Sequence, residues 1–133
     1  MKIKIGINGM GRIGRMILRS IYEGNKDIEI KHINNRTNSE TCSTLLKYDS
    51  IHGKFKADIS YDEKNLIVNK NKISFGQETD LNKIDWKKYG VDYVFECTGK
   101  FNSKDKLGPH LNNGAKKVIV SAPCKNADKT IVF

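Results

Sequence analysis

Three glycines near the start of the chain constrain its fold more than any other feature. Gly9, Gly11 and Gly14 follow an alternating apolar run over residues 3–8 and open residues 12–23, where apolar side chains recur at helical spacing. The first glycine permits a tight turn, the second lets another group approach the backbone closely, and the third lets the helix pack against the strand. The pattern therefore predicts a strand, a tight turn and a helix.

A second strand and a second helix are expected next. Gly24 is placed to cap the end of the first helix, and residues 27–34 carry isoleucines in a strand-like run. Thr37 followed by Glu40 has the spacing of a capping box, which predicts a short helix reaching Tyr48. The first half of the chain is thus a strand–helix–strand unit followed by a helix.

The second half changes character and then returns to the same alternation. Residues 54–75 form short alternating runs broken by turn-forming residues, which predicts a small antiparallel insertion. Residues 91–97 and 117–121 read as strands, and residues 103–113, which include Pro109, predict a helix between them. The fold class expected is α/β, a Rossmann-type doubly wound and mostly parallel sheet with a small antiparallel insertion.

Length and composition indicate one domain over residues 1–133. The hydrophobic fraction of 38% suffices for one modest core, and no signal peptide or membrane span is visible. Three widely spaced cysteines without CxxC spacing exclude a disulfide framework and a zinc site, so a reducing cytoplasm is expected. The apolar run over residues 130–133 suggests that the chain stops inside a strand, before a further domain.

The net charge of +9 raises the question of a polyanionic partner. The lysines are scattered in short clusters, and no interleaving of aromatics and glycines accompanies them. We therefore predict a solvated basic surface and no nucleic-acid partner.

The glycine motif predicts dinucleotide binding because it lies inside a complete strand–helix–strand unit. Free N–H groups and the dipole at the helix N-terminus attract a pyrophosphate, and Arg12 adds positive charge beside it. The alternative is that the glycines serve a tight turn alone.

The acidic residue that usually follows such a motif by about 20 residues is missing. Asn35 stands at that position, and Arg36 follows it. An amide can bond a ribose hydroxyl without repelling a 2′-phosphate, and Arg36 could pair with that phosphate. The cofactor is therefore NAD or NADP, and the alternative is that Arg36 faces solvent while NAD is used.

Four blocks of sequence resemble one family, the phosphorylating glyceraldehyde-3-phosphate dehydrogenases. Residues 5–15 read IGINGMGRIGR, residues 46–55 read LKYDSIHGKF, residues 96–101 read ECTGKF and residues 114–123 read GAKKVIVSAP. The blocks occur in that family in this order and at this spacing.

The resemblance implies the cofactor-binding domain of a homotetrameric glycolytic oxidoreductase that phosphorylates an aldehyde while passing hydride to NAD(P). It implies a pyrophosphate loop at Asn8, Gly9, Gly11, Arg12 and Ile13, and a ribose contact at Asn35. It further implies adenosine-side contacts at Thr98, Gly99 and Phe101, and a turn toward the nicotinamide at Ser121 and Ala122. Many members have Glu-Arg where this chain has Glu78-Thr79, which puts side-chain contacts to the adenine there in doubt.

No catalytic residue is expected within these residues. The family's nucleophilic cysteine lies in a Ser-Cys-Thr-Thr-Asn segment, which this sequence does not contain. Cys124 lacks those neighbours and a histidine base, while Cys42 and Cys97 are predicted to serve packing. The resemblance implies packing and subunit contact for His52, and neither of the other two histidines, His32 and His110, receives a role.

One alternative is an enzyme of the same class, erythrose-4-phosphate dehydrogenase, which shares the motifs. Two alternatives differ in class: a non-catalytic dinucleotide-binding module needs nothing beyond the motifs, and an RNA-binding protein would use the positive charge. The fragment itself is predicted to be inactive.

Overall fold

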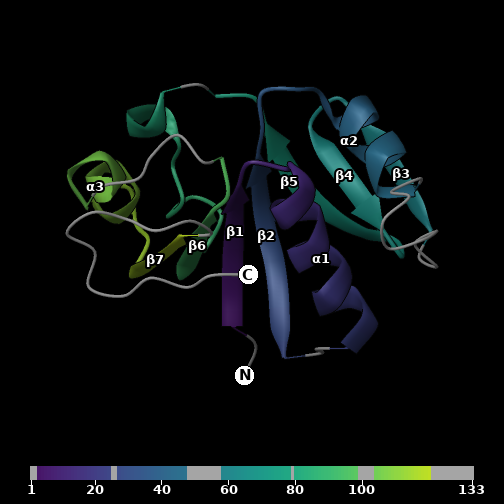
Figure 1. The fold of residues 1–133 in the computed structure, drawn as a ribbon, viewed down its shortest axis with the longest axis horizontal. Coiled ribbons are helices and arrows are strands. Elements are labelled where there is room, and N and C mark those ends of the chain that lie inside the picture. The colour runs from purple at the N-terminus through teal and green to yellow at the C-terminus, as the bar shows by residue number, and fades with distance from the viewer. Residues whose placement is uncertain (1–2, 25–26, 48–57, 79, 99–103, 121–133) are drawn as a thin grey trace.

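One sheet with β1 near its centre organises the chain (Figure 1). The computed structural model describes residues 3–24, 27–47, 58–78, 80–98 and 104–120. Within those residues the elements are β1 (Ile3–Asn8), α1 (Arg12–Gly24), β2 (Ile28–Asn34), α2 (Ser39–Lys47), β3 (Ile59–Asp62), β4 (Asn65–Val68), β5 (Asn71–Gly76), the 3₁₀ helix η1 (Leu81–Lys83), β6 (Tyr93–Glu96), α3 (Lys104–Asn112) and β7 (Lys117–Val120).

The strands of the described residues follow the order β3-β4-β5-β2-β1-β6-β7. β5, β2, β1, β6 and β7 are parallel, whereas β3, β4 and β5 pair antiparallel. This confirms the predicted mostly parallel Rossmann-type sheet with an antiparallel part. The boundary of the insertion is corrected, because β5 also pairs with β2 and so belongs to the parallel sheet.

A two-residue turn fixes the register of the antiparallel part. Asn69 and Lys70 both have positive φ, 49° and 70°, between the paired residues Val68 and Asn71. Two positive φ values give the turn a twist that matches the twist of the flanking strands.

A bulge in β2 assigns its side chains to the two faces of the sheet. Ile5 pairs with Ile30, but the next residue of β1, Gly6, pairs with His32, so Lys31 is the extra residue. After the bulge Ile33 returns to the main core with Ile30, and His32 faces the opposite side with Gly6. The bulge explains why Ile30 and Ile33, which strict alternation would place on opposite faces, lie in the same core.

The first face is covered by α1, as Figure 1 shows. Ile17, Leu18 and Ile21 are buried in the same core cluster as Ile5 and Ile7 of β1. Complete burial of a side chain such as Leu18 contributes roughly 1.5–3 kcal/mol, so tertiary packing rather than intrinsic propensity stabilises this helix.

The opposite face is built around Trp86, which is completely buried. Together with Ile84, Val91 and Val94 it forms part of a second hydrophobic cluster. A Cβ on Gly6 would collide with the indole ring, so β1 carries a glycine where the tryptophan crosses it.

Two helix ends test the capping predictions. The Oδ1 of Asn38 accepts the N–H of Thr41 at 2.9 Å, so Asn38 caps α2 and the predicted cap at Thr37 is wrong. Both residues are capping types, and the choice between adjacent candidates depends on where the strand ends. Gly114, with φ 117°, ends α3 as expected.

Candidate dinucleotide-binding site

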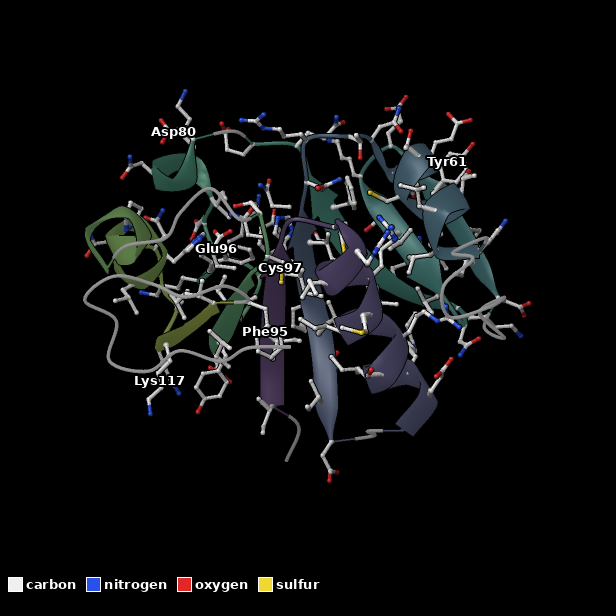
Figure 2. The ribbon with its side chains drawn as sticks, viewed as in Figure 1. Tyr61, Asp80, Phe95, Glu96, Cys97 and Lys117 are labelled. Carbon is white, nitrogen blue, oxygen red and sulfur yellow. The ribbon has the colours of Figure 1, made fainter. Side chains whose placement is uncertain are left out.

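The glycine loop, residues 9–14, lies at the carboxyl end of β1, where the sheet changes direction. β1 pairs with β2 on one side and β6 on the other, and the chain continues outward from each of these neighbours. Ligands of open α/β sheets bind in the crevice outside the strand ends at such a switch point. The carboxyl ends of β1 and β6, where Glu96 and Cys97 lie (Figure 2), border this position.

Each glycine of the loop meets a different requirement. Gly9 has φ 100°, and a Cβ there would lie 2.8 Å from the backbone nitrogen of Thr98. A Cβ on Gly14 would collide with the carbonyl oxygen of Gly9. A Cβ on Gly11 meets no described atom within 4 Å, and Gly11 is exposed. The fold therefore requires Gly9 and Gly14, whereas the space beside Gly11 is open for a ligand.

The N-terminus of α1 offers donors to an anion. The first hydrogen bond of the helix runs from Arg15 N to Gly11 O at 3.0 Å. The N–H groups of Arg12, Ile13 and Gly14 precede that bond and are not used within the helix. The Arg12 side chain is exposed beside them. Backbone donors, the helix dipole and one cation thus converge where a pyrophosphate is expected.

Two hydrogen bonds, one long-range and one local, hold the loop in shape. The N–H of Gly9 donates to Asn34 O at 2.7 Å, and the Arg15 guanidinium donates to Met10 O at 2.9 Å. The loop is therefore positioned before any ligand arrives, which lowers the entropy cost of binding.

Asn35 follows β2 and connects the loop to α2. Its Oδ1 accepts the N–H of Met10 at 2.9 Å, while its Nδ2 donates to Thr37 Oγ1 at 2.6 Å and to Cys42 Sγ at 3.2 Å. Both amide hydrogens are engaged, so Asn35 presents the second lone pair of Oδ1 to a ligand. That lone pair can accept a hydrogen bond from a ribose hydroxyl.

Arg36 is exposed at the same edge of the sheet. The side chain of Gln77 donates to its carbonyl oxygen at 3.0 Å and fixes the backbone. A neighbouring cavity of about 360 Å³ is lined by Asn38, Ser39, Glu40, Tyr61, Glu63 and Gln77. Its two carboxylates oppose a phosphate, so a 2′-phosphate would have to be bound on the Arg36 side.

Sequence reasoning missed a buried hydrogen-bond network beneath the site. We define the Glu96 network as the side chains of Asn8, Asn34, Trp86, Glu96, Thr98 and His110. Glu96 is 1% exposed and His110 is completely buried. A signal was available, because a carboxylate at the end of a buried parallel strand requires partners.

The structure places the predicted site residues as follows. Asn8 ends β1 with its side chain in the Glu96 network, Gly9, Gly11, Arg12 and Ile13 form the loop and helix start, and Asn35, Arg36 and Thr98 flank them. Gly99, Phe101, Ser121 and Ala122 lie outside the described residues, as do Cys124 and His52.

Neither described cysteine resembles a nucleophile. Cys42 is completely buried in α2, and burial raises the pKa of its thiol more than its bonds with Thr37 and Asn35 lower it. Cys97 is half-buried and packs against the main core. Where the structure gives side-chain positions, no three metal-ligating residues gather together.

His32 occupies the face opposite α1. Its ring stacks on Tyr89 at a centroid distance of 3.9 Å and meets the edge of Trp86 at 5.5 Å. Burial, with a smaller contribution from Lys88, lowers the pKa of His32 to about 4. Its Nδ1 is buried and has no hydrogen-bond partner among the described residues, so the residue serves packing as a neutral imidazole.

One protein family and several curated relatives match this chain. The family described as "Glyceraldehyde 3-phosphate dehydrogenase, NAD binding domain" matches residues 3–104. The chain is 48% identical over 131 residues to glyceraldehyde-3-phosphate dehydrogenase of Thermotoga maritima, which covers 98% of the chain and 39% of that protein. It is 47% identical over its full length to the Geobacillus stearothermophilus enzyme, again across 39% of the relative.

A third relative gives the same result. The chromosomal glyceraldehyde-3-phosphate dehydrogenase of Cupriavidus necator is 48% identical over 136 aligned residues, which cover the whole chain and 40% of the relative. The chain thus spans about two fifths of the length of these curated relatives. Across the described part of the chain, no helix is long and apolar enough to cross a membrane. The chain belongs to the glyceraldehyde-3-phosphate dehydrogenase family and corresponds to its NAD-binding domain.

Proposed function

We propose that this chain binds a nicotinamide dinucleotide across the carboxyl ends of β1, β2 and β6. The observation that carries the proposal is the glycine loop, in which a Cβ on Gly11 would meet no described atom while the N–H groups of Arg12 and Ile13, in the first turn of α1, are not used within the helix. The pyrophosphate would lie over Gly11, and the adenosine ribose would donate to Asn35 Oδ1.

We propose that, in the whole protein, this domain serves a reaction in which a phosphorylated aldehyde is oxidised and the resulting acyl group is transferred to phosphate. When bound, the nicotinamide ring supplies the hydride acceptor. The residues of this chain bind and orient the cofactor, and none of the described side chains supplies a nucleophile. Erythrose-4-phosphate dehydrogenase and a non-catalytic dinucleotide-binding module are the alternatives, since the substrate-selecting residues are expected elsewhere.

We propose a homotetramer that works in the cytoplasm, as the family resemblance implies, with no nucleic acid as partner. The scattered basic side chains of the described residues support solvation of that charge rather than a groove for a polyanion.

The first test is direct binding. We expect the 133-residue chain to bind NAD in calorimetry and to show no aldehyde oxidation, because the glycine loop is formed and no nucleophile accompanies it among the described residues. Absence of binding by NAD and NADP alike would contradict the proposed function. Sustained NADH production from an aldehyde substrate would contradict the absence of a catalytic residue.

We propose further that the site accepts NADP as well as NAD. Asn35 carries no charge that would repel a 2′-phosphate, and the exposed Arg36 can pair with it. Asn35→Asp is a conservative test, because Oδ1 can still accept from Met10 while the Thr37 hydroxyl and the Cys42 thiol reverse their bonds and donate.

We expect Asn35→Asp to weaken NADP binding far more than NAD binding, and Arg36→Ala to weaken NADP binding alone. A charge-assisted contact is typically worth about 1.5–3 kcal/mol, or roughly ten- to a hundredfold in affinity. Calorimetric titration of both variants with both cofactors measures the ratio. If neither substitution changes the ratio of NADP affinity to NAD affinity, Arg36 faces solvent and Asn35 is a ribose contact only.

A further inference from the structure

The Glu96 network has a consistent direction of hydrogen bonding. Asn8 Nδ2 and His110 Nε2 meet Glu96 Oε1 at 2.7 and 2.9 Å, while the N–H and hydroxyl of Thr98 donate to Oε2 at 3.0 and 2.6 Å. Trp86 Nε1 can only donate, so His110 Nδ1 accepts from it at 2.9 Å and the imidazole proton resides on Nε2. Four donors therefore converge on one carboxylate.

The same direction continues across the sheet to the segment after β5. Asn8 Oδ1 accepts from Asn34 Nδ2 at 2.9 Å. The Oδ1 of Asn34 accepts the N–H of Glu78 at 2.8 Å, and its Nδ2 also donates to Glu78 O at 2.8 Å. The orientation of each amide is set by its neighbour, and Glu96 is the final acceptor.

The groups held by the network surround the proposed cofactor. Asn8 precedes Gly9, whose Cα lies so close to Thr98 that a Cβ would be 2.8 Å from its backbone nitrogen. Glu78 follows β5, whose carboxyl end pairs with the end of β2 that precedes Asn35, the proposed ribose contact. The network thus joins the glycine loop, Thr98 and the segment after β5 through buried side chains that do not need to touch a ligand.

We propose that Glu96 is a positioning residue for the dinucleotide: its carboxylate holds the glycine loop, Thr98 and the Glu78 segment in the arrangement that the cofactor requires. This inference rests on the proposed function, because it concerns how the same site is shaped. It assigns no chemical step to Glu96.

The substitution Glu96→Gln tests the role of the acceptor because it preserves volume. If the amide nitrogen replaces Oε2, it faces the N–H of Thr98, which cannot reverse. If it replaces Oε1, it faces Asn8 and His110, and reversing either residue creates a conflict with Asn34 or with Trp86. Every arrangement leaves two donors opposed, so the strand ends must move apart.

We expect Glu96→Gln to weaken NAD binding about tenfold in calorimetry and to shift the indole N–H resonance of Trp86, the only tryptophan in the chain. The matched control is Val91→Ala, which removes buried methyl groups from the cluster around Trp86 and lies outside the Glu96 network. It should lower the free energy of unfolding while leaving the NAD dissociation constant within about twofold.

If Glu96 had a purely structural role, Glu96→Gln would behave as the control does: the free energy of unfolding would fall and the NAD dissociation constant would stay within about twofold. Wild-type affinity in a folded Glu96→Gln variant overturns the inference, whereas failure of the wild type to bind contradicts the proposed function instead. Should Glu96→Gln not fold, His110→Phe carries the test, because it removes one donor from Oε1 without reversing any polarity. We expect it to weaken NAD binding about threefold, and unchanged affinity would overturn the proposal.

Discussion

Gly11→Val is expected to abolish dinucleotide binding while leaving the fold intact. Valine places a branched side chain in the open space where the pyrophosphate must approach the backbone. We expect the dissociation constant of NAD to rise at least about a hundredfold, equivalent to about 2.7 kcal/mol. The free energy of unfolding should change by less than about 1 kcal/mol, because the added atoms meet no described neighbour.

Calorimetry and urea unfolding measure the two quantities on the same samples. Gly24→Val is the matched control, since Gly24 ends α1 and a Cβ there also meets no described atom within 4 Å. The control should bind NAD as the wild type does. Unchanged affinity in Gly11→Val would show that the pyrophosphate does not pass over this residue.

Acidification is expected to destabilise the domain through His32. The pKa of His32 is about 4 in the folded chain and about 6.5 when the residue is exposed on unfolding. Above pH 6.5 both states are neutral, so His32 contributes no pH dependence there. As the pH falls from 6.5 to 4, His32 becomes protonated in the unfolded state but stays neutral in the folded state. This difference lowers the free energy of unfolding by up to about 3 kcal/mol.

Urea unfolding between pH 7.5 and 4.5 measures this loss, and His32→Phe isolates it from other titrating groups. Phenylalanine keeps an aromatic ring against Tyr89 and Trp86 and does not titrate. The variant should therefore lose less stability than the wild type over this range. Parallel curves for the two proteins would show that His32 titrates normally in the folded chain.

The parts of the fold that depend on neighbours in sequence could be predicted. The strand, glycine loop and helix of the first 24 residues obey local rules, and the turn at Asn69 and Lys70 is a two-residue hairpin signal. The prediction that Thr37 caps α2 was wrong because Thr37 and Asn38 are both suitable capping residues, and the end of β2 decides between them.

The parts that depend on distant residues could not be predicted. Asn8 bonds Glu96 across 88 positions of sequence, and Trp86 bonds His110 across 24. A histidine inside a weakly patterned helix gives no sign of its partner, so His110 received no role. The sequence also did not reveal that β5 pairs with β2 as well as with β4. The pairing with β2 is set by packing between the strands and not by the alternation within β5.

The different surroundings of Gly11 and Gly14 have an evolutionary consequence. Any descendant that keeps this fold must avoid a side chain at Gly14, whether or not it still uses a cofactor, because the carbonyl of Gly9 occupies that space. Among the described residues no atom restrains Gly11, which leaves the proposed ligand as its restraint. A lineage that abandoned the dinucleotide would therefore lose this glycine first, and the change would mark the loss of the cofactor before the fold showed any sign of it.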